Sequence, residues 1–282
     1  MNAWIALLYL IPKNLMSRVV GFLAQLNLPK AARNILFKLF IHGYGIHMDE
    51  AEMSLLDYKS FDALFTRRLK TGRRQIESDF VSPCDGTVSY SQTSLANMAL
   101  QVKGHAYSLE ELVGLPEHVS KRLAFFQTIY LAPHNYHRVH APISGKLESI
   151  IWIPGFLWPV APAIIPYIPA LFNQNERLVF KLNVQTSKTL YVVMVGALNV
   201  GRISTPFWPD MYTNSGQKNR TKRDFEDTAV VIGQELGTFH LGSTVVMVFD
   251  QELTDELPLK RDEALGPIQQ GQSLLSPQGL IP

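Results

Sequence analysis

The chain has 282 residues, of which 46% are hydrophobic, and its formal net charge at pH 7 is only +2. It is long enough to bury a substantial core, so we expect one large domain with an N-terminal appendage. The nearly balanced charge, without a basic stripe and interleaved aromatics, excludes a typical nucleic-acid-binding protein, and the single cysteine, Cys84, excludes an intrachain disulfide framework.

An apolar run at residues 4–11 opens the chain and ends at Pro12 and Lys13. It is much shorter than the roughly 20 residues that a transmembrane helix needs. A secretory signal is also disfavoured, because no Lys or Arg precedes the run and no small-residue cleavage site follows it. We therefore expect a peripheral protein on the cytoplasmic face of the membrane.

Two amphipathic helices are predicted next. Over residues 14–26 polar side chains such as Arg18 gather on one narrow face, and apolar side chains such as Phe22 lie opposite. A second helix is predicted over residues 31–40, after the helix-starting Pro29. Before Asp49 the chain has five basic residues and no acidic one. The helices either pack on the domain or lie on an anionic bilayer surface, and the basic bias favours the surface.

Beyond about residue 78 the pattern changes to short β-prone runs separated by turn residues. These runs lie at residues 87–89, 125–131, 147–152, 178–182, 190–195, 229–232 and 243–249. Their spacing predicts an α+β fold with a mostly antiparallel, barrel-like or sandwich-like catalytic domain over residues 78–282. Residues 1–77 are expected to form an N-terminal helical, membrane-associating region.

Two long connections are distinctive. Residues 151–175 contain five prolines, no charged residue and large apolar side chains such as Trp158 and Ile165, which suggests an acyl-chain or membrane-contact loop. The polar stretch at residues 214–227 is predicted to be a mobile loop that closes over the site.

The tetrad Leu-Gly-Ser-Thr at residues 241–244 lies between a turn at Gly237 and an apolar run. Gly242 has no Cβ, so its carbonyl admits close approach of a nucleophile from Ser243. Attack by this serine makes an ester, β-elimination leaves dehydroalanine, and loss of ammonia then leaves an N-terminal pyruvoyl group. The alternative is an ordinary strand start after a small turn.

An acid–base partner for that serine is available. A hydroxyl needs an imidazole to take its proton and a carboxylate to orient the imidazole. Asp85 occupies a Pro-Cys-Asp-Gly turn, and His134, His137 and His140 recur at three-residue spacing. Asp85 is alternatively a turn residue that caps its own backbone. The histidines are alternatively residues of an edge strand or zinc ligands, although the single cysteine and the triplet spacing argue against zinc.

Several separated motifs occur in a fixed order. They are Phe-Thr-Arg-Arg-Leu-Lys at 65–70, Pro-Cys-Asp-Gly at 83–86, Tyr-His-Arg-Val-His at 136–140, Asn-Glu-Arg at 175–177, Gly-Gln-Glu-Leu-Gly at 233–237 and Leu-Gly-Ser-Thr at 241–244. Along nearly its whole length the chain resembles the phosphatidylserine decarboxylase proenzymes of bacteria, of the membrane-associated, pyruvoyl-dependent kind. The resemblance implies that Asp85, His140 and Ser243 form a self-processing triad, with His140 as the base and Asp85 orienting it. It also implies that His137 assists decarboxylation by handling the proton delivered to the carbanion.

By the same resemblance, cleavage falls between Gly242 and Ser243. The products are a large chain, 1–242, and a small chain, 243–282, whose first residue is a pyruvoyl group derived from Ser243. This group takes the amine of phosphatidylserine as a Schiff base and acts as the electron sink for loss of CO2, which gives phosphatidylethanolamine. No exogenous cofactor and no metal are expected. The expected partners are phosphatidylserine, an anionic membrane surface, the small chain itself and a second copy in a homodimer.

Two other functions stay open at this point. A serine hydrolase acting on a lipid ester would use the same three residues, although the chain lacks a Gly-x-Ser-x-Gly elbow. A non-catalytic membrane-surface binding module would share the basic amphipathic start and would not need Ser243. A hydrolase stays one chain, and a binding module tolerates Ser243→Ala.

Overall fold

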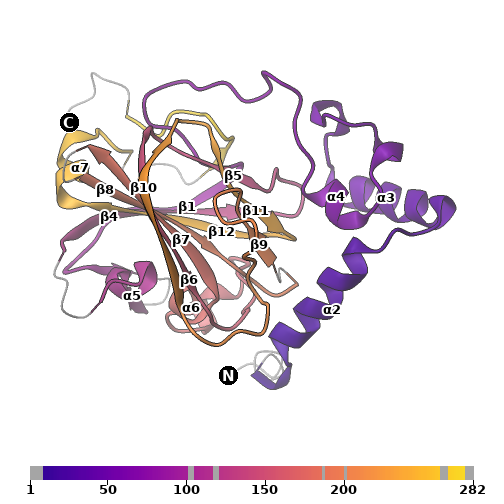
Figure 1. Cartoon of the computed structure of the whole chain (residues 1–282), viewed down its shortest axis with the longest axis horizontal. Helices are drawn as coiled ribbons and strands as arrows, with labels where there is room; N and C mark the ends of the chain where they lie inside the picture. Colours follow the sequence, from indigo (N-terminus) through magenta and orange to yellow (C-terminus); the bar gives the residue numbers. More distant parts are fainter. Residues whose placement is uncertain are drawn as a thin grey trace.

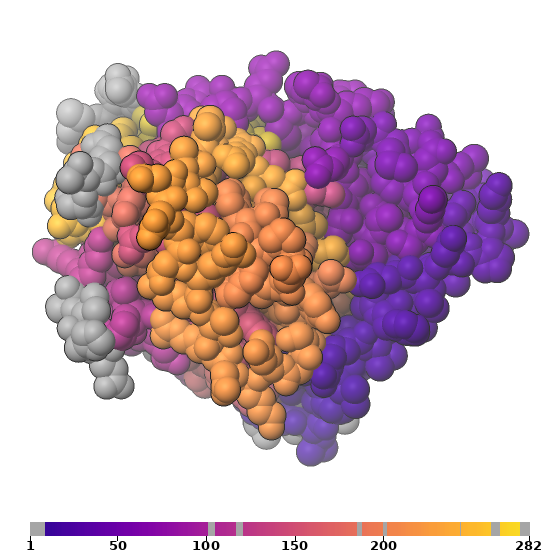
Figure 2. Space-filling view, in the orientation of Figure 1, coloured from indigo at the N-terminus to yellow at the C-terminus, as the bar shows by residue number. Residues whose placement is uncertain are grey.

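The computed structural model describes residues 9–100, 105–116, 121–185, 188–199, 202–260 and 266–276. Most of the apolar run at 4–11 lies outside these residues. In Figure 1 a helical N-terminal segment lies to one side of a β-rich body, and in Figure 2 the same segment forms one continuous lobe against that body.

The body is built on an antiparallel sheet of eight strands in the order β10-β6-β7-β8-β12-β4-β1-β13. The strands are β1 (Gly86–Thr93), β4 (Leu123–Leu131), β6 (Gly145–Ile153), β7 (Arg177–Gln185), β8 (Lys188–Val195), β10 (Thr221–Val230), β12 (Ser243–Asp250) and β13 (Pro267–Ile268). The sheet is open at β10 and β13. The predicted α+β class and antiparallel pairing are confirmed, in the sandwich-like form.

Two smaller sheets accompany it. Strands β5 (Arg138–His140), β11 (Glu235–His240) and β9 (Arg202–Ser204) pair in the order β5-β11-β9, and β2 (Met98–Leu100) pairs with β3 (Ala106–Ser108). Short helices α5 (Leu109–Val113), α6 (Leu171–Gln174) and α7 (Gln251–Glu256) cover loops and strand ends. The three-stranded sheet carries His140 at the end of β5, and its strand β11 leads directly into the Leu-Gly-Ser-Thr tetrad.

The central strands are continuous apolar runs because both of their faces are covered. From Leu190 to Val195 in β8 and from Val245 to Phe249 in β12, every side chain is buried, as is typical of strands enclosed on both sides. Their neighbours supply large core side chains, among them Trp152, Phe125 and Phe180. This packing fixes the start of β12, where the tetrad lies.

The N-terminal segment contains α2 (Lys13–Gln25), α3 (Lys30–Tyr44) and α4 (Phe61–Phe65), with 3-10 turns at Met48–Glu50 and Leu55–Asp57. Both predicted helices are confirmed. The second one continues through Gly43 to Tyr44 and ends at Gly45, which adopts a left-handed φ of 64°. Phe37, Tyr58 and Leu64 form a small core separate from that of the sheet.

No helix within the described ranges combines the length and apolar character needed to cross a membrane.

Two predictions about loops are corrected. Residues 221–227 belong to strand β10, which pairs with β6 from Thr221 opposite Trp152 to Val230 opposite Gly145. β10 is an edge strand with mostly exposed polar side chains, so its composition is that of a loop although its backbone is paired.

The proline-rich connection is the second correction. Trp158 and Ile165 are each only 3% exposed and belong to the main core, so they are not available for lipid contact. The buried Asn175 side chain binds both backbone groups of Trp158, accepting from its N–H and donating to its carbonyl, each at 2.9 Å. These bonds satisfy the backbone polar groups of Trp158 in a loop that has no regular structure, so the loop can be buried. Phe156 and Tyr167 stay exposed.

Candidate functional site

The backbone just before Ser243 is strained. Ser243 is the first residue of β12 and lies opposite Leu131 of β4; its side chain is outside the described part of the structure. Leu241 has a φ of 85° and Gly242 a φ of 38°. A left-handed conformation is costly for a branched residue such as leucine. The peptide that joins Gly242 to Ser243 therefore follows a turn that the surrounding structure must hold in place.

Asp85 lies at the turn that leads into β1 and is held by an arginine. Its carboxylate accepts hydrogen bonds from Arg74 Nε at 2.9 Å and Arg74 Nη2 at 2.6 Å, and from the backbone N–H of Gln270 at 2.9 Å. Arg74 also binds Glu50. Burial lowers the pKa of Arg74, but the hydrogen bonds to Asp85 and Glu50 outweigh this and raise its pKa above the ordinary value. The pair is buried and rigid.

His140, the last residue of β5, is oriented by a backbone carbonyl. Its Nδ1 lies 2.7 Å from the Gly233 carbonyl and its Nε2 lies 3.1 Å from the Tyr136 hydroxyl, and the Tyr136 ring stacks on the imidazole. A carbonyl only accepts, so Nδ1 carries the hydrogen, and in the neutral ring the lone pair of Nε2 accepts a hydrogen bond from the Tyr136 hydroxyl. Burial lowers the pKa of His140, and this effect is larger than that of the hydrogen bond to Gly233, which raises the pKa. The imidazole is thus a neutral base whose lone pair is on Nε2.

In a hydrogen-bonded triad the Asp85 carboxylate would accept directly from the His140 ring, and the described contacts of these two residues are different. Among the described contacts Asp85 binds Arg74 and Gln270, and His140 binds Gly233 and Tyr136. The two residues are linked through the backbone, because the His140 N–H donates to the Pro83 carbonyl at 2.8 Å. The negative charge of Asp85 still acts on the ring, since it raises the pKa of His140.

His137 is fully buried and directly precedes β5 in the sequence. Its ring packs on Phe65, with ring centroids 4.0 Å apart, and neither ring nitrogen has a hydrogen-bond partner of good geometry among the described residues. Burial, together with the positive charge of Arg67, lowers the pKa of His137 to about 3. The imidazole is therefore neutral at physiological pH.

Metal ligation was an open alternative for the histidine motif. Within the described ranges no group of three or more His, Cys, Asp or Glu side chains is arranged to hold a metal ion. Cys84 is buried, and burial raises the pKa of its thiol well above the ordinary value.

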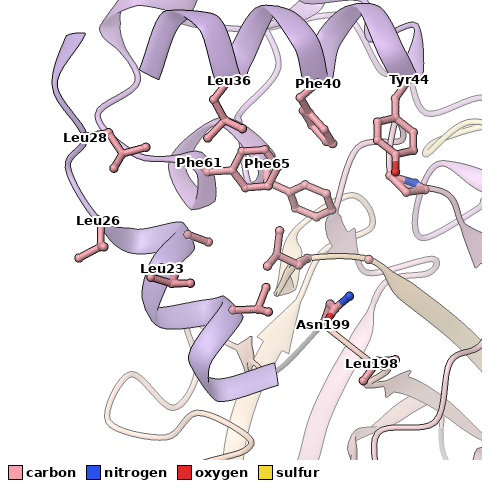
Figure 3. Close-up of a pocket in the computed structure, with 15 residues that line it drawn as sticks. Leu23, Leu26, Leu28, Leu36, Phe40, Tyr44, Phe61, Phe65, Leu198 and Asn199 are labelled. Carbon is pink, nitrogen blue, oxygen red and sulfur yellow. The ribbon is translucent and has the colours of Figure 1, made fainter. Parts of the chain in front are cut away.

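An apolar cavity of about 570 Å³ opens at the tetrad, between it and the N-terminal helices. Figure 3 shows side chains from α2, α3 and α4 around it, with Leu198 and Asn199 across from them. The lining consists of Val20, Leu23, Ala24, Leu26, Leu28, Leu36, Phe40, Tyr44, Phe61, Phe65, Pro133, Leu198, Asn199, Leu241 and Gly242. Leu241 and Gly242 thus form part of the wall of a cavity suited to hydrocarbon.

A family model for phosphatidylserine decarboxylase matches residues 61–276. The chain belongs to this family. It is 36% identical over 278 residues to a phosphatidylserine decarboxylase proenzyme of Myxococcus xanthus, covering 95% of this chain and 99% of that protein. A proenzyme of the same name from Psychromonas ingrahamii is 40% identical over 252 residues, with 86% and 87% covered. One from Shewanella frigidimarina is 40% identical over 259 residues, with 88% and 89% covered.

In this member of the phosphatidylserine decarboxylase family the apolar faces of α2 and α3 lie partly on the outer surface and partly on the wall of the cavity. Exposed apolar residues on them are Leu15, Val19, Phe22, Leu23, Leu26, Ile35, Leu36, Leu39 and Tyr44. The residues that α2 and α3 bury include Lys13 and Ser17, and Arg33 and Phe37. Many of these apolar side chains are therefore not packed on the domain, and their docking on a bilayer surface stays a prediction.

Sequence reasoning missed a three-residue hydrogen-bond chain beside the tetrad. His240 Nδ1 lies 2.9 Å and 3.0 Å from the two carboxylate oxygens of Asp62, and His240 Nε2 lies 2.9 Å from Ser204 Oγ. The three residues come from α4, β9 and β11. Arg74, Gly233 and Tyr136 were missed as well. An arginine shortly before a turn aspartate is a weak sequence signal for the Arg74 pair, and no residue type marks a carbonyl such as that of Gly233.

Proposed function

We propose that this chain is a proenzyme that cuts itself before Ser243 and then decarboxylates phosphatidylserine to phosphatidylethanolamine and CO2. Membership of the family, and the names of its relatives, support the activity. The observation that carries the proposal is the strained left-handed backbone at Leu241 and Gly242, directly before Ser243 and in the wall of an apolar cavity.

The cleavage needs no outside oxidant or reductant. Ser243 Oγ attacks the Gly242 carbonyl carbon and gives up its proton, the C–N bond breaks, and the acyl group moves from nitrogen to oxygen. Loss of the Ser243 α-proton then expels the Gly242 carboxylate and leaves a carbon–carbon double bond. One water replaces nitrogen, ammonia leaves, and residue 243 ends as a pyruvoyl group. The strained turn favours the first step, because a bond broken at a strained peptide relieves that strain.

His140 is the base that we assign to this step. Its Nδ1–H donates to the Gly233 carbonyl, so Nε2, which accepts from the Tyr136 hydroxyl, carries the lone pair that takes a proton. Because burial lowers the pKa of His140, the neutral form that a base requires predominates at pH 7. Asp85, held by Arg74, acts through its charge, which favours the imidazolium that forms. This is a positioning and electrostatic role.

The site fits a pyruvoyl group at residue 243. Leu241 and Gly242 lie in the cavity wall, so the end of β12 opens toward space that accommodates an acyl chain. When present, the group supplies a ketone that engages the substrate amine and accepts electrons as CO2 leaves. Phe65 and the neighbouring apolar side chains exclude water. His137, neutral and buried behind Phe65, is the residue we assign to holding the proton that replaces CO2.

We further propose that α2 and α3 lie on the cytoplasmic face of the bacterial plasma membrane. Their apolar side chains are exposed in a row, and Arg18, Lys30 and Lys38 are exposed beside them. Burial of apolar side chains and attraction to anionic lipid both favour this placement. The cavity opens among the same helices, so a lipid passes from the bilayer to the tetrad without crossing water. Homodimer formation stays a prediction.

Intact-mass measurement of the purified protein tests the proposal. We expect two chains that split between Gly242 and Ser243, with the smaller one lacking a free N-terminal amine and trapped as a reduced adduct by borohydride with substrate. Ser243→Ala should stay whole and inactive, and Ser89→Ala, a matched control on β1, should behave as wild type. A protein of undivided mass that still decarboxylates phosphatidylserine contradicts the proposal, and one that instead hydrolyses a lipid ester favours a hydrolase.

A further inference from the structure

The hydrogen-bond chain formed by Asp62, His240 and Ser204 has no role in the chemistry above, yet it ends two residues from the cleavage point. His240 is the last residue of β11, and Leu241 and Gly242 follow it. We propose that His240, bound on one side by Asp62 and on the other by Ser204, is a positioning residue that holds the strained turn for self-cleavage. The inference rests on the proposed cleavage before Ser243.

The chain fixes the His240 ring completely. A carboxylate only accepts hydrogen bonds, so Nδ1 carries the hydrogen that Asp62 receives at 2.9 Å. Nε2 is 2.9 Å from Ser204 Oγ, and a hydroxyl either donates to a neutral ring or accepts from a charged one. Both ring nitrogens are therefore satisfied in either protonation state. The Asp62 and His240 side chains are only 16% and 17% exposed, so water competes weakly for these bonds.

The chain also joins segments that the sheets do not join. β9 and β11 already pair, with Thr238 opposite Ser204 and His240 opposite Arg202. Helix α4 belongs to the N-terminal segment, and the bond from Asp62 connects it to the end of β11. On its other side α4 is connected to β5, because Arg138 Nε donates to the Thr66 carbonyl at 3.0 Å. The helix is thus fastened to both strands that flank the site.

The same helix shares an apolar cavity with the turn. Phe61 and Phe65 of α4 line the cavity together with Leu241 and Gly242, and Asp62 is three residues from Phe65, on the same face of the helix. A left-handed leucine persists only where its surroundings determine its conformation. The hydrogen bonds of His240 hold one end of the short segment 240–242. The cavity wall that includes Phe65 also includes the other end of this segment. Loosening His240 releases the turn and lets the Gly242 carbonyl leave the position in which it is attacked.

The experiment compares the half-time of chain splitting with turnover per split chain, for Asp62→Ala, Asp62→Asn, His240→Ala and the double variant Asp62→Ala/His240→Ala. Newly synthesised protein is followed by intact mass, and decarboxylation is measured after splitting is complete. Asp57→Ala removes a carboxylate from the same segment and serves as the matched control. Urea unfolding of each variant separates slow cleavage from loss of fold.

We expect Asp62→Ala and His240→Ala to split about ten-fold more slowly, the effect of losing one hydrogen bond to a charged group. Asp62→Asn, which keeps an acceptor, should recover most of the rate. The double variant should be no slower than the slower single variant, since both break the same bond. Turnover per split chain should stay within about two-fold, because the cut lies between His240 and the reacting residue.

Three results overturn the inference: splitting at the wild-type rate in both single variants, additive slowing in the double variant, or turnover that falls in step with splitting. If Asp62→Ala does not fold, Ser204→Ala, which removes only the hydroxyl partner, gives the deciding rate. A wild-type chain that never splits contradicts the proposed function and the inference together. If the wild-type chain splits and the variants split at the same rate, the inference alone is contradicted.

Discussion

Phe65 of α4 packs against the buried imidazole of His137, with ring centroids 4.0 Å apart and the ring planes tilted by 36°, and the same phenylalanine lines the cavity that reaches Gly242. A helix of the N-terminal segment therefore seals a histidine of the β-rich body from water. The sealing has a measurable consequence, because a histidine kept neutral in the folded state makes stability depend on pH.

Folding stability should fall in acid through His137. Its pKa is lowered to about 3 in the folded chain, so between pH 6.5 and pH 3 the unfolded chain binds the extra proton and the native state loses stability as pH falls. Relative to pH 7, this histidine alone costs about 2 kcal/mol at pH 5. Urea unfolding of wild type and His137→Gln at both values gives the difference. The exposed His42→Gln is the control, and an equal pH dependence in wild type and His137→Gln contradicts the assignment.

Glu176 should have the opposite pH dependence. Burial raises its pKa to about 7, so the native state holds a proton that the unfolded chain releases, and stability is lost as pH rises from about 4.5 through 7. Gln keeps an acceptor for the bonds from Trp152 Nε1 and the Asn214 N–H. Glu176→Gln should therefore stabilise the chain by about 3 kcal/mol at pH 8 and by less than about 1 kcal/mol at pH 5. Glu252→Gln, at an exposed site on α7, should change neither value.

Removing Arg74 should destabilise the chain strongly. Arg74→Met leaves the Asp85 carboxylate, which is 5% exposed, without its cation, at a cost of about 3–5 kcal/mol. Arg73→Met next to it breaks only an exposed pair with Asp49 and should cost less than about 1 kcal/mol. Chemical denaturation compares them. Similar losses for the two variants would mean that the buried network contributes little.

Vesicle binding should depend on the apolar faces of α2 and α3. Phe22 and Leu39 are 66% and 67% exposed, and Leu95 of the β-rich body is 76% exposed. Phe22→Asp/Leu39→Asp should lower the partition coefficient on vesicles with anionic lipid by at least about ten-fold, while Leu95→Asp should not. Co-sedimentation at fixed ionic strength measures this. Unchanged binding of the double variant places the membrane contact elsewhere.

The elements that follow local periodicity were predictable from sequence. Residues 14–26 and 190–195 carry patterns that hold regardless of neighbours, and both form the expected helix and strand. Only the end of β10 was predicted, within the run at 229–232, and residues 221–228 were missed because an exposed edge strand with polar side chains lacks such a pattern. Trp158 was misjudged because its burial depends on Asn175, seventeen positions along the chain.

At the candidate site the residue types were predictable and their partners were not. Ser243, His140 and Asp85 were selected by chemistry and motif. The hydrogen bond from His140 goes to the Gly233 carbonyl, a group that every residue has. Asp62 and His240 are 178 positions apart, and only the folding of α4 against β11 brings them together.

Strand β12 lies between β4 and β8 in the interior of the eight-stranded sheet, with hydrogen bonds along both edges. A break in the main chain ahead of Ser243 therefore does not free the shorter piece. Its first eight residues remain hydrogen-bonded to β4 and β8 in the sheet. Separating the two pieces therefore requires unfolding of the β-rich body. The mature assembly should co-purify as one particle until it is unfolded.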